Sequence, residues 1–173
     1  MEAKLGTIKL DIGAGAPNWQ RKPLEEWIHL DAIAHPHIEL VQEFVDIPLP
    51  DGACKEIYIG DIIEHIPQWR YDEVLKEWNR VLMMGGIVKG TCPNGDRAMK
   101  LYSSGEISFD DAKLALYGWA INATETHFNC FTKETLTELF EKHGFEVKDY
   151  SGSPGNEDMP WWLVFVGTKV RNG

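Results

Sequence analysis

The chain has few cysteines and no long apolar run. Its three cysteines, Cys54, Cys92 and Cys130, stand far apart and form no Cys-x-x-Cys pair. This spacing argues against a disulfide framework or a zinc site and favours buried, reduced thiols. No run approaches the roughly 20 apolar residues of a membrane span, and the first residues are not a signal-peptide apolar segment. We therefore expect a soluble, cytoplasmic protein with no membrane partner.

The chain also has no cluster of basic residues. The 27 acids outnumber the 17 lysines and arginines, which gives a formal charge of −10. This charge opposes attraction to phosphate backbones, so nucleic acid is an unlikely partner. With 173 residues and 43% hydrophobic composition, the chain can bury one substantial core, and we expect a single domain over residues 1–173.

What the sequence does contain is an alternation of short β-like runs with helical or turn segments. Such alternation predicts an α/β fold with a parallel sheet and crossover connections. The expected strands are 7–12, 27–30, 43–45, 56–59, 87–91, 145–150 and 161–168. The last two have no helix between them, which indicates an antiparallel end to the sheet. The expected helices are 71–82, 110–117, with a capping box of Ser108 and Asp111, and 133–143, capped by Thr132 and ended by Gly144.

The most informative segment follows the first expected strand, where Asp11 precedes Gly13 and Gly15. Glycines at this spacing allow a sharp turn and a close approach of the backbone to a ligand. An acid at position 11 would repel a pyrophosphate but would bind an amino group, such as that of S-adenosylmethionine. An ordinary turn at the end of a strand is the alternative interpretation.

Two further acids end expected strands. Asp31 ends the second strand twenty residues after Asp11, a position suited to accepting hydrogen bonds from both ribose hydroxyls. Asp46 ends the third expected strand, where its carboxylate could accept a hydrogen bond from the adenine amine. A solvated loop acid at Asp31 and a turn-forming aspartate before Pro48 are the alternatives.

The order of these motifs resembles the class I S-adenosylmethionine-dependent methyltransferases, in particular their small methyltransferase-domain family. The resemblance covers roughly residues 7–150. The matching segments are Leu10-Asp11-Ile12-Gly13-Ala14-Gly15, Ile28-His29-Leu30-Asp31, residues 45–52, Ile62-Ile63-Glu64-His65-Ile66 and Glu77-Trp78-Asn79-Arg80-Val81-Leu82-Met83-Met84-Gly85-Gly86. Two departures are Ala16-Pro17 at the third glycine of the longer pattern and Met83-Met84 in place of Lys-Pro. Pro17 and Pro23 also interrupt the segment of the first crossover helix.

The resemblance implies a Rossmann-like, doubly wound, mostly parallel sheet with an antiparallel edge strand in a three-layer α/β/α arrangement. It also implies S-adenosyl-L-methionine as the cofactor. The implied cofactor contacts are Asp11, Gly13 and Gly15 for the methionine part, Asp31 for the ribose, Asp46 for the adenine end, and Gly60, Asp61 and Ile62 for the pocket wall. Glu64 and His65 correspond to the family's Glu-His pair, which more often organises the loop than performs chemistry.

Methyl transfer requires a base only when the acceptor is protonated. Weak candidates for this base are His65 and His127, with a loop or core histidine as the alternative for the second. The His35-Pro36-His37 segment has no accompanying acid or cysteine cluster, so a surface turn is expected there and no metal site is predicted. Four aromatic residues lie where the family builds its acceptor pocket, unless they belong to the core. They are Tyr117, Trp119, Phe128 and Phe131.

The sequence thus predicts a methyltransferase that acts on a small-molecule acceptor. One alternative is a noncatalytic S-adenosylmethionine-binding or assembly module, which would bind the cofactor without turnover. The other is a nicotinamide-dependent oxidoreductase, since Asp31 could also bind the ribose of that cofactor. Asp11 and the missing third glycine disfavour the oxidoreductase.

Overall fold

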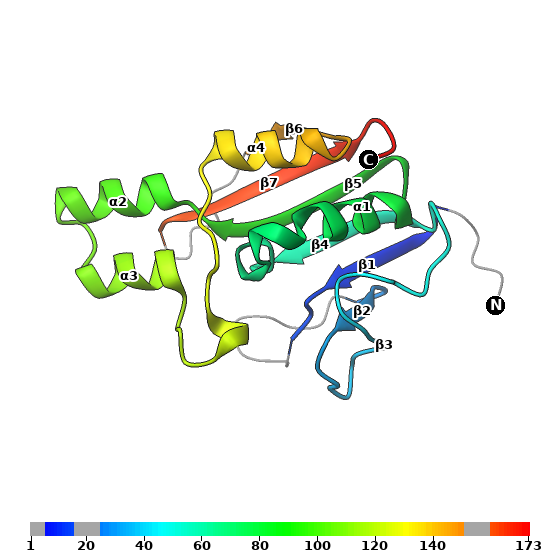
Figure 1. Cartoon of the computed structure of the whole chain (residues 1–173), viewed down its shortest axis with the longest axis horizontal. Helices are drawn as coiled ribbons and strands as arrows, with labels where there is room; N and C mark the ends of the chain where they lie inside the picture. Colours follow the sequence, from blue (N-terminus) through cyan, green and yellow to red (C-terminus); the bar gives the residue numbers. More distant parts are fainter. Residues whose placement is uncertain (1–5, 16–24, 151–159) are drawn as a thin grey trace.

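A seven-stranded sheet forms the centre of the molecule (Figure 1). The computed structural model describes residues 6–15, 25–150 and 160–173, so Pro17 and Pro23 lie outside the described residues. The strands are β1 (Ile8–Ile12), β2 (Ile28–Asp31), β3 (Leu40–Val41), β4 (Cys54–Gly60), β5 (Leu82–Pro93), β6 (Phe145–Asp149) and β7 (Trp162–Lys169).

The strand order is β3-β2-β1-β4-β5-β7-β6. Strands β1 to β5 pair in parallel, while β7 runs antiparallel to both β5 and the edge strand β6. From the central strand β1, the chain adds β2 and β3 on one side and β4, β5, β7 and β6 on the other. This arrangement confirms the predicted doubly wound, mostly parallel sheet with an antiparallel end.

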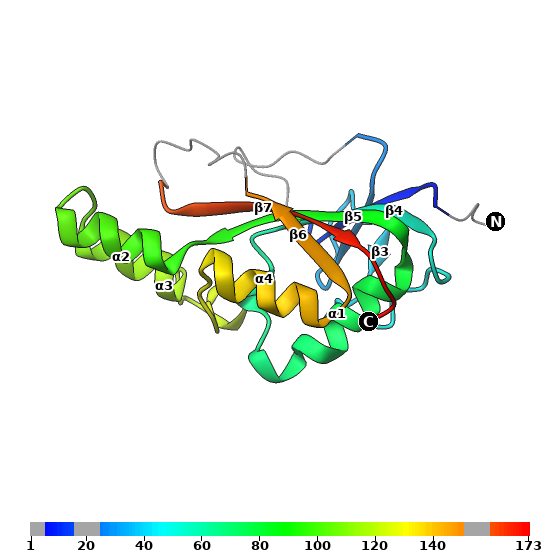
Figure 2. The same cartoon turned by 90° about the horizontal axis from the view of Figure 1, so that it is seen from above.

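The helices are α1 (Tyr71–Val81), α2 (Gly95–Ser104), α3 (Phe109–Tyr117) and α4 (Lys133–Lys142), with short 3₁₀ turns η1 (Ile63–His65), η2 (Gln68–Arg70) and η3 (Ala123–Glu125). Figure 2 shows α1 and α4 on the same side of the sheet and α2 and α3 beyond one end of it. Among the described helices, α1 and α4 are the two that cover a face of the sheet.

Local sequence explains where these helices begin and end. In α1 the apolar side chains Val74, Leu75 and Trp78 lie on one buried face, as their spacing predicts. The predicted capping box of Ser108 and Asp111 starts α3, and Thr132 caps α4. Both caps satisfy backbone N–H groups that have no partner inside the helix.

Strand β5 is longer than the predicted strand 87–91, and two other elements differ more from the prediction. The third strand is Leu40–Val41 instead of 43–45, because the chain bends after Val41 and reaches a positive φ of 51° at Asp46. Helix α2 was not predicted, because it begins at Gly95 directly after Pro93 and Asn94, and these residue types are typical of turns. The Asn94 side chain begins it by accepting a hydrogen bond from the Arg97 N–H, and Gly105 ends it with φ 80°.

The main core lies between the sheet and the α1–α4 layer. Trp78, Phe140 and Phe165 are fully buried there, and the rings of Phe140 and Phe165 are 5.1 Å apart. A smaller cluster of Ala98, Ala115 and Trp161 attaches α2 and α3 to the end of the sheet. Within the described residues, every helix is too short or too polar to cross a membrane.

Arg80 fixes the connection between β3 and β4 to helix α1. Its guanidinium donates hydrogen bonds to the carbonyls of Ile47 and Leu49 and to the carboxylates of Asp51 and Glu77. Glu77 in turn accepts from the Ile47 N–H at 2.7 Å. The Arg-Val-Leu segment that contributed to the family resemblance therefore has a structural role in this chain.

Candidate functional site

A cavity of about 660 Å³ opens at the carboxyl ends of the parallel strands. Its wall includes Gly13 and Gly15 after β1, Asp31 at the end of β2, and Asp61 directly after β4. The turn η1 and the segment between α3 and α4 complete the wall. Open α/β sheets bind their ligands at this edge because the strand order reverses there.

The turn after β1 brings backbone close to the cavity. Gly13 and Gly15 have φ values of 69° and 63°, which residues with a Cβ adopt only with strain. The N–H groups of Gly13 and Ala14 donate to the Leu30 carbonyl. A Cβ at Gly13 would lie 2.0 Å from Ile62 Cδ1, so glycine is required here both for conformation and for space.

Asp31 is joined to this turn. One of its carboxylate oxygens accepts a hydrogen bond from the Gly15 N–H at 2.9 Å, and the other accepts from the Ile33 N–H at 2.8 Å. Each carboxylate oxygen has a second lone pair available to a ligand. The glycine turn and the strand-end acid therefore form one hydrogen-bonded unit in the cavity wall.

Of the other predicted cofactor contacts, Asp61 lies in the cavity wall and Asp11 and Asp46 do not. Asp61 lines the cavity with φ 55° and accepts from the Thr91 hydroxyl at 2.9 Å. Asp11 is 1% exposed and lies behind the wall, with its carboxylate 4.0 Å from His29 Nε2. Asp46 is exposed and is not part of the lining, whereas Glu43 and Phe44 are. The cofactor roles of Asp11 and Asp46 stay predictions.

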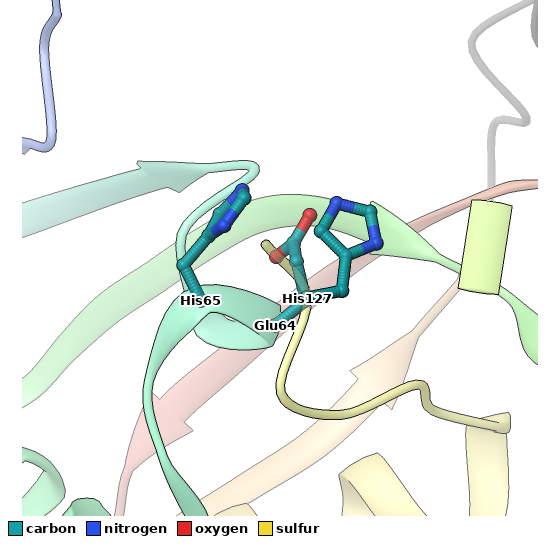
Figure 3. A group of neighbouring side chains, drawn as sticks. All are labelled: Glu64, His65 and His127. Atoms are coloured by element: carbon teal, nitrogen blue, oxygen red, sulfur yellow. The ribbon is translucent and has the colours of Figure 1, made fainter. Parts of the chain in front are cut away.

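Both candidate histidines line the cavity, and they lie against each other. The rings of His65 and His127 have centroids 4.8 Å apart at an interplanar angle of 77°. Figure 3 shows the Glu64 side chain beside them. One possible metal-ligand atom from each of the three residues lies within 4.8 Å of the other two. No sequence spacing indicates this cluster, because His127 is far from Glu64 and His65 along the chain.

Main-chain hydrogen bonds hold the two parts of this cluster together. The Glu64 carbonyl accepts from the N–H groups of Phe128 and Asn129, and the Asn129 side chain donates to the Ile66 carbonyl. The His127 N–H donates to the Tyr117 carbonyl at the end of α3. The segment after α3 is thereby fixed against η1, which places His127 over the end of β4.

Burial controls the charges of the cluster. Burial raises the pKa of the Glu64 carboxyl well above its usual range, and the negative charge of Asp61 adds to the effect. Burial lowers the pKa of His65, and burial together with the neighbouring His65 lowers the pKa of His127 to about 4. Both imidazoles are therefore neutral at pH 7.

The aromatic residues near the cavity divide into two groups. Trp119 and Phe128 line it, together with Phe44, Trp161 and Trp162. Of the other two aromatic candidates, Phe131 is buried in the main core and Tyr117 is 60% exposed, and neither is part of the lining. Phe44, Trp161 and Trp162 were not among the predicted acceptor-pocket residues, because only the fold brings the start of β7 and the segment after β3 to the same cavity.

The His35-Pro36-His37 segment forms the expected turn, in which the Ile38 N–H donates to the His35 carbonyl.

Comparison of the sequence with protein-family models finds no match, and comparison with curated proteins finds none. Solved structures do match. A Burkholderia thailandensis 1,6-didemethyltoxoflavin-N1-methyltransferase with bound 1,6-didemethyltoxoflavin and S-adenosylhomocysteine has a TM-score of 0.69 at 15% identity, over 96% of this chain and 72% of that one. An Archaeoglobus fulgidus S-adenosylmethionine-dependent methyltransferase has a TM-score of 0.63 at 17% identity, over 95% and 86%.

A third match is a chain of the complex between the Haloferax volcanii Trm112 methyltransferase activator and a methyltransferase. It has a TM-score of 0.60 at 15% identity, over 99% of this chain and 86% of that one. At these identities the likeness concerns the fold. The chain has the fold of the class I S-adenosylmethionine-dependent methyltransferases, as the order of its sequence motifs predicted.

Proposed function

We propose that this chain is an S-adenosylmethionine-dependent methyltransferase that acts on a small-molecule acceptor. The observation that carries the proposal is the hydrogen bond from the Gly15 N–H to Asp31 in the wall of the cavity. It joins a close-approach glycine turn to a ribose-type acid at the edge of the sheet where α/β folds bind nucleotides. The shared fold with cofactor-bound methyltransferases supports the same assignment.

The proposed cofactor pose follows the cavity wall. The methionine part lies along the turn of Gly13 and Gly15, and the ribose hydroxyls donate to Asp31. Phe44 covers the adenine ring, in the region that the sequence analysis assigned to Asp46. Asp61 lies at the end of β4, on the side of the pocket that faces Glu64 and the two histidines.

The reaction needs alignment more than activation, because the sulfonium is already an activated donor. A lone pair of the acceptor forms a bond to the methyl carbon as the carbon–sulfur bond breaks, and the electron pair of that bond stays on sulfur. The acceptor's proton, where there is one, leaves to a base or to water. His65 and His127 line the cavity and are the candidates for this base, although their lowered pKa values make both of them weak bases. Trp119 and Phe128 also line the cavity and would enclose an apolar or planar acceptor.

The test is calorimetric titration of the whole protein with S-adenosylmethionine, S-adenosylhomocysteine and NAD in parallel. We expect binding of the first two and none of NAD. Binding of NAD alone would indicate the oxidoreductase instead. Binding of S-adenosylmethionine without methyl transfer to any member of a small-molecule acceptor panel would favour the noncatalytic binding module.

A further inference from the structure

Three side chains around the inner end of the cavity have the composition of a metal-binding site. Glu64 and His65 come from η1, and His127 comes from the segment between α3 and α4 (Figure 3). Each offers one ligand atom, and these atoms lie within 4.8 Å of one another. Two imidazoles and one carboxylate form a common ligand set for divalent transition metals.

The hydrogen bonds of the two histidines leave one nitrogen of each ring, Nε2, available to a ligand. His65 Nδ1 lies 3.0 Å from the Thr126 carbonyl oxygen, and His127 Nδ1 lies 3.1 Å from the Ala115 carbonyl oxygen. A carbonyl oxygen only accepts, so each Nδ1 carries the hydrogen and each neutral ring has its lone pair on Nε2. Metal-ligating histidines are typically oriented in this way by a backbone carbonyl.

Glu64 is the independent observation that points to a ligand. Its side chain is 1% exposed, and its Oε2 atom is buried without a hydrogen-bond partner. Arg70, the one arginine or lysine in the cavity wall of the described residues, directs its guanidinium to Glu43 and Glu73 instead. A buried carboxyl oxygen without a partner costs free energy unless a ligand satisfies it.

We propose that Glu64, His65 and His127 bind a divalent transition-metal ion, of the class of Zn²⁺ or Co²⁺, in the cavity. Two ligands of such an ion at about 2.1 Å can be at most about 4.2 Å apart, so binding draws the side chains slightly inward. Three protein ligands leave coordination positions open on the cavity side. There the ion would bind an oxygen or nitrogen of the methyl acceptor, a role that rests on the proposed function, whereas ion binding itself does not. With the ion bound, the Nε2 lone pairs of His65 and His127 coordinate it, so the acceptor's proton would leave to water instead of to these histidines.

The experiment is calorimetric titration of chelator-treated whole protein with Zn²⁺ in the absence of S-adenosylmethionine, repeated with Co²⁺ and followed by its visible absorption. The variants are Glu64→Gln, His65→Asn and His127→Asn. The asparagine amide occupies the position of Nδ1, so each histidine variant retains the donor to its carbonyl and loses only Nε2. Circular dichroism and thermal unfolding confirm the fold of each variant, and S-adenosylhomocysteine affinity is measured on the same samples.

We expect one ion per chain and at least a ten-fold loss of Zn²⁺ affinity in each of the three variants. His37→Ala is the matched control and should bind as the unchanged protein does. Absence of binding, unchanged affinity in folded Glu64→Gln and His127→Asn, or loss of binding in His37→Ala would overturn the proposal. Zn²⁺ binding by a protein that does not bind S-adenosylhomocysteine would uphold the metal site and reject the proposed function.

Discussion

Asp31 has two roles that a single substitution affects together. Its carboxylate accepts backbone hydrogen bonds from Gly15 and Ile33, and in the proposed pose it also accepts from the ribose hydroxyls of the cofactor. The first role shapes the glycine turn, and the second binds the ligand. A test of Asp31 must therefore measure the stability of the protein and its affinity for S-adenosylhomocysteine separately.

We expect Asp31→Ala to weaken S-adenosylhomocysteine binding by about 1.5–3 kcal/mol, the usual contribution of hydrogen bonds to a charged group. Calorimetry measures the affinity, and thermal unfolding measures the stability of the same sample. Glu138→Ala, at an exposed position of α4, is the control and should change neither. Unchanged affinity in a folded Asp31→Ala protein would remove this residue from the site.

Gly13 and Gly85 share a backbone conformation but differ in surroundings. Their φ values are 69° and 75°, yet a Cβ at Gly13 would meet Ile62 Cδ1 at 2.0 Å, while nothing lies within 4 Å of a Cβ at Gly85. Gly85→Ala therefore measures the cost of placing a Cβ on a backbone with positive φ. Gly13→Ala measures the same cost together with the steric clash against Ile62.

Both substitutions should lower the free energy of unfolding by roughly 1–2 kcal/mol, the cost of left-handed backbone for a residue with a Cβ. Gly13→Ala should be the more destabilised variant and should also lose cofactor binding, because the turn shifts away from Ile62. Denaturant titration and calorimetry give the two quantities. Equal cofactor affinity in the two variants would show that the turn after β1 is not part of the binding site.

At the scale of elements, a polar cluster joins the start of α1 to the end of α4. Asp72 in the first turn of α1 accepts a hydrogen bond from Lys142 and lies 2.8 Å from His143 Nε2. Hydrogen bonds from Lys142 and then His143 lower the pKa of Asp72 to about 2. A carboxyl whose pKa is lowered by folding stabilises the native state above its unfolded pKa of about 4.

This contribution should disappear as the pH falls from about 4 to about 2, through the pKa of the folded state. We expect Asp72→Asn to lower the melting temperature at neutral pH and to reduce its fall over that acidic range. The measurement is thermal unfolding at a series of pH values, with Asp110→Asn at another exposed ion pair as the control. Parallel curves for Asp72→Asn and the unchanged protein would contradict the assignment.

At the scale of the whole molecule, one core connects the sheet with the helices of its covered face. Cys54 in β4 and Cys92 in β5 are both fully buried in it, whereas Cys130 is exposed. Burial raises the pKa of Cys54 to about 12 and raises the pKa of Cys92 well above its usual range. Because the thiolate is the reactive form, these two thiols report opening of the core.

We expect a thiol reagent such as Ellman's reagent to modify Cys130 rapidly in the native protein and all three cysteines after denaturation. Absorbance of the released thiolate measures the number of reacted groups. Cys130→Ser should remove the rapid phase. Fast reaction of Cys54 or Cys92 in the native protein would show that the core between β4 and β5 opens locally.

Local sequence determined the elements of this protein and their order along the chain. The caps at Ser108 and Thr132 are local signals, since their hydrogen bonds join residues within one turn. The glycine turn and Asp31 each follow a strand in the sequence, although the hydrogen bond between them joins residues 16 positions apart. The sequence motifs also predicted the methyltransferase-like fold, because their order resembles that of the class I S-adenosylmethionine-dependent methyltransferases. The place of β3 was mispredicted because Phe44 and Val45 lie in a bend, and α2 was missed because Pro93, Asn94 and Gly95 at its start are residue types typical of turns.

Tertiary structure alone decided which side chains meet at the cavity. It left Asp46 outside the cavity wall and placed Glu43 and Phe44 in the wall. It also brought His127 against His65 and Glu64, which no sequence spacing indicates. The physical reason is that these contacts depend on how segments far apart in the chain pack at one edge of the sheet, whereas caps, turns and strand ends depend on neighbours along it.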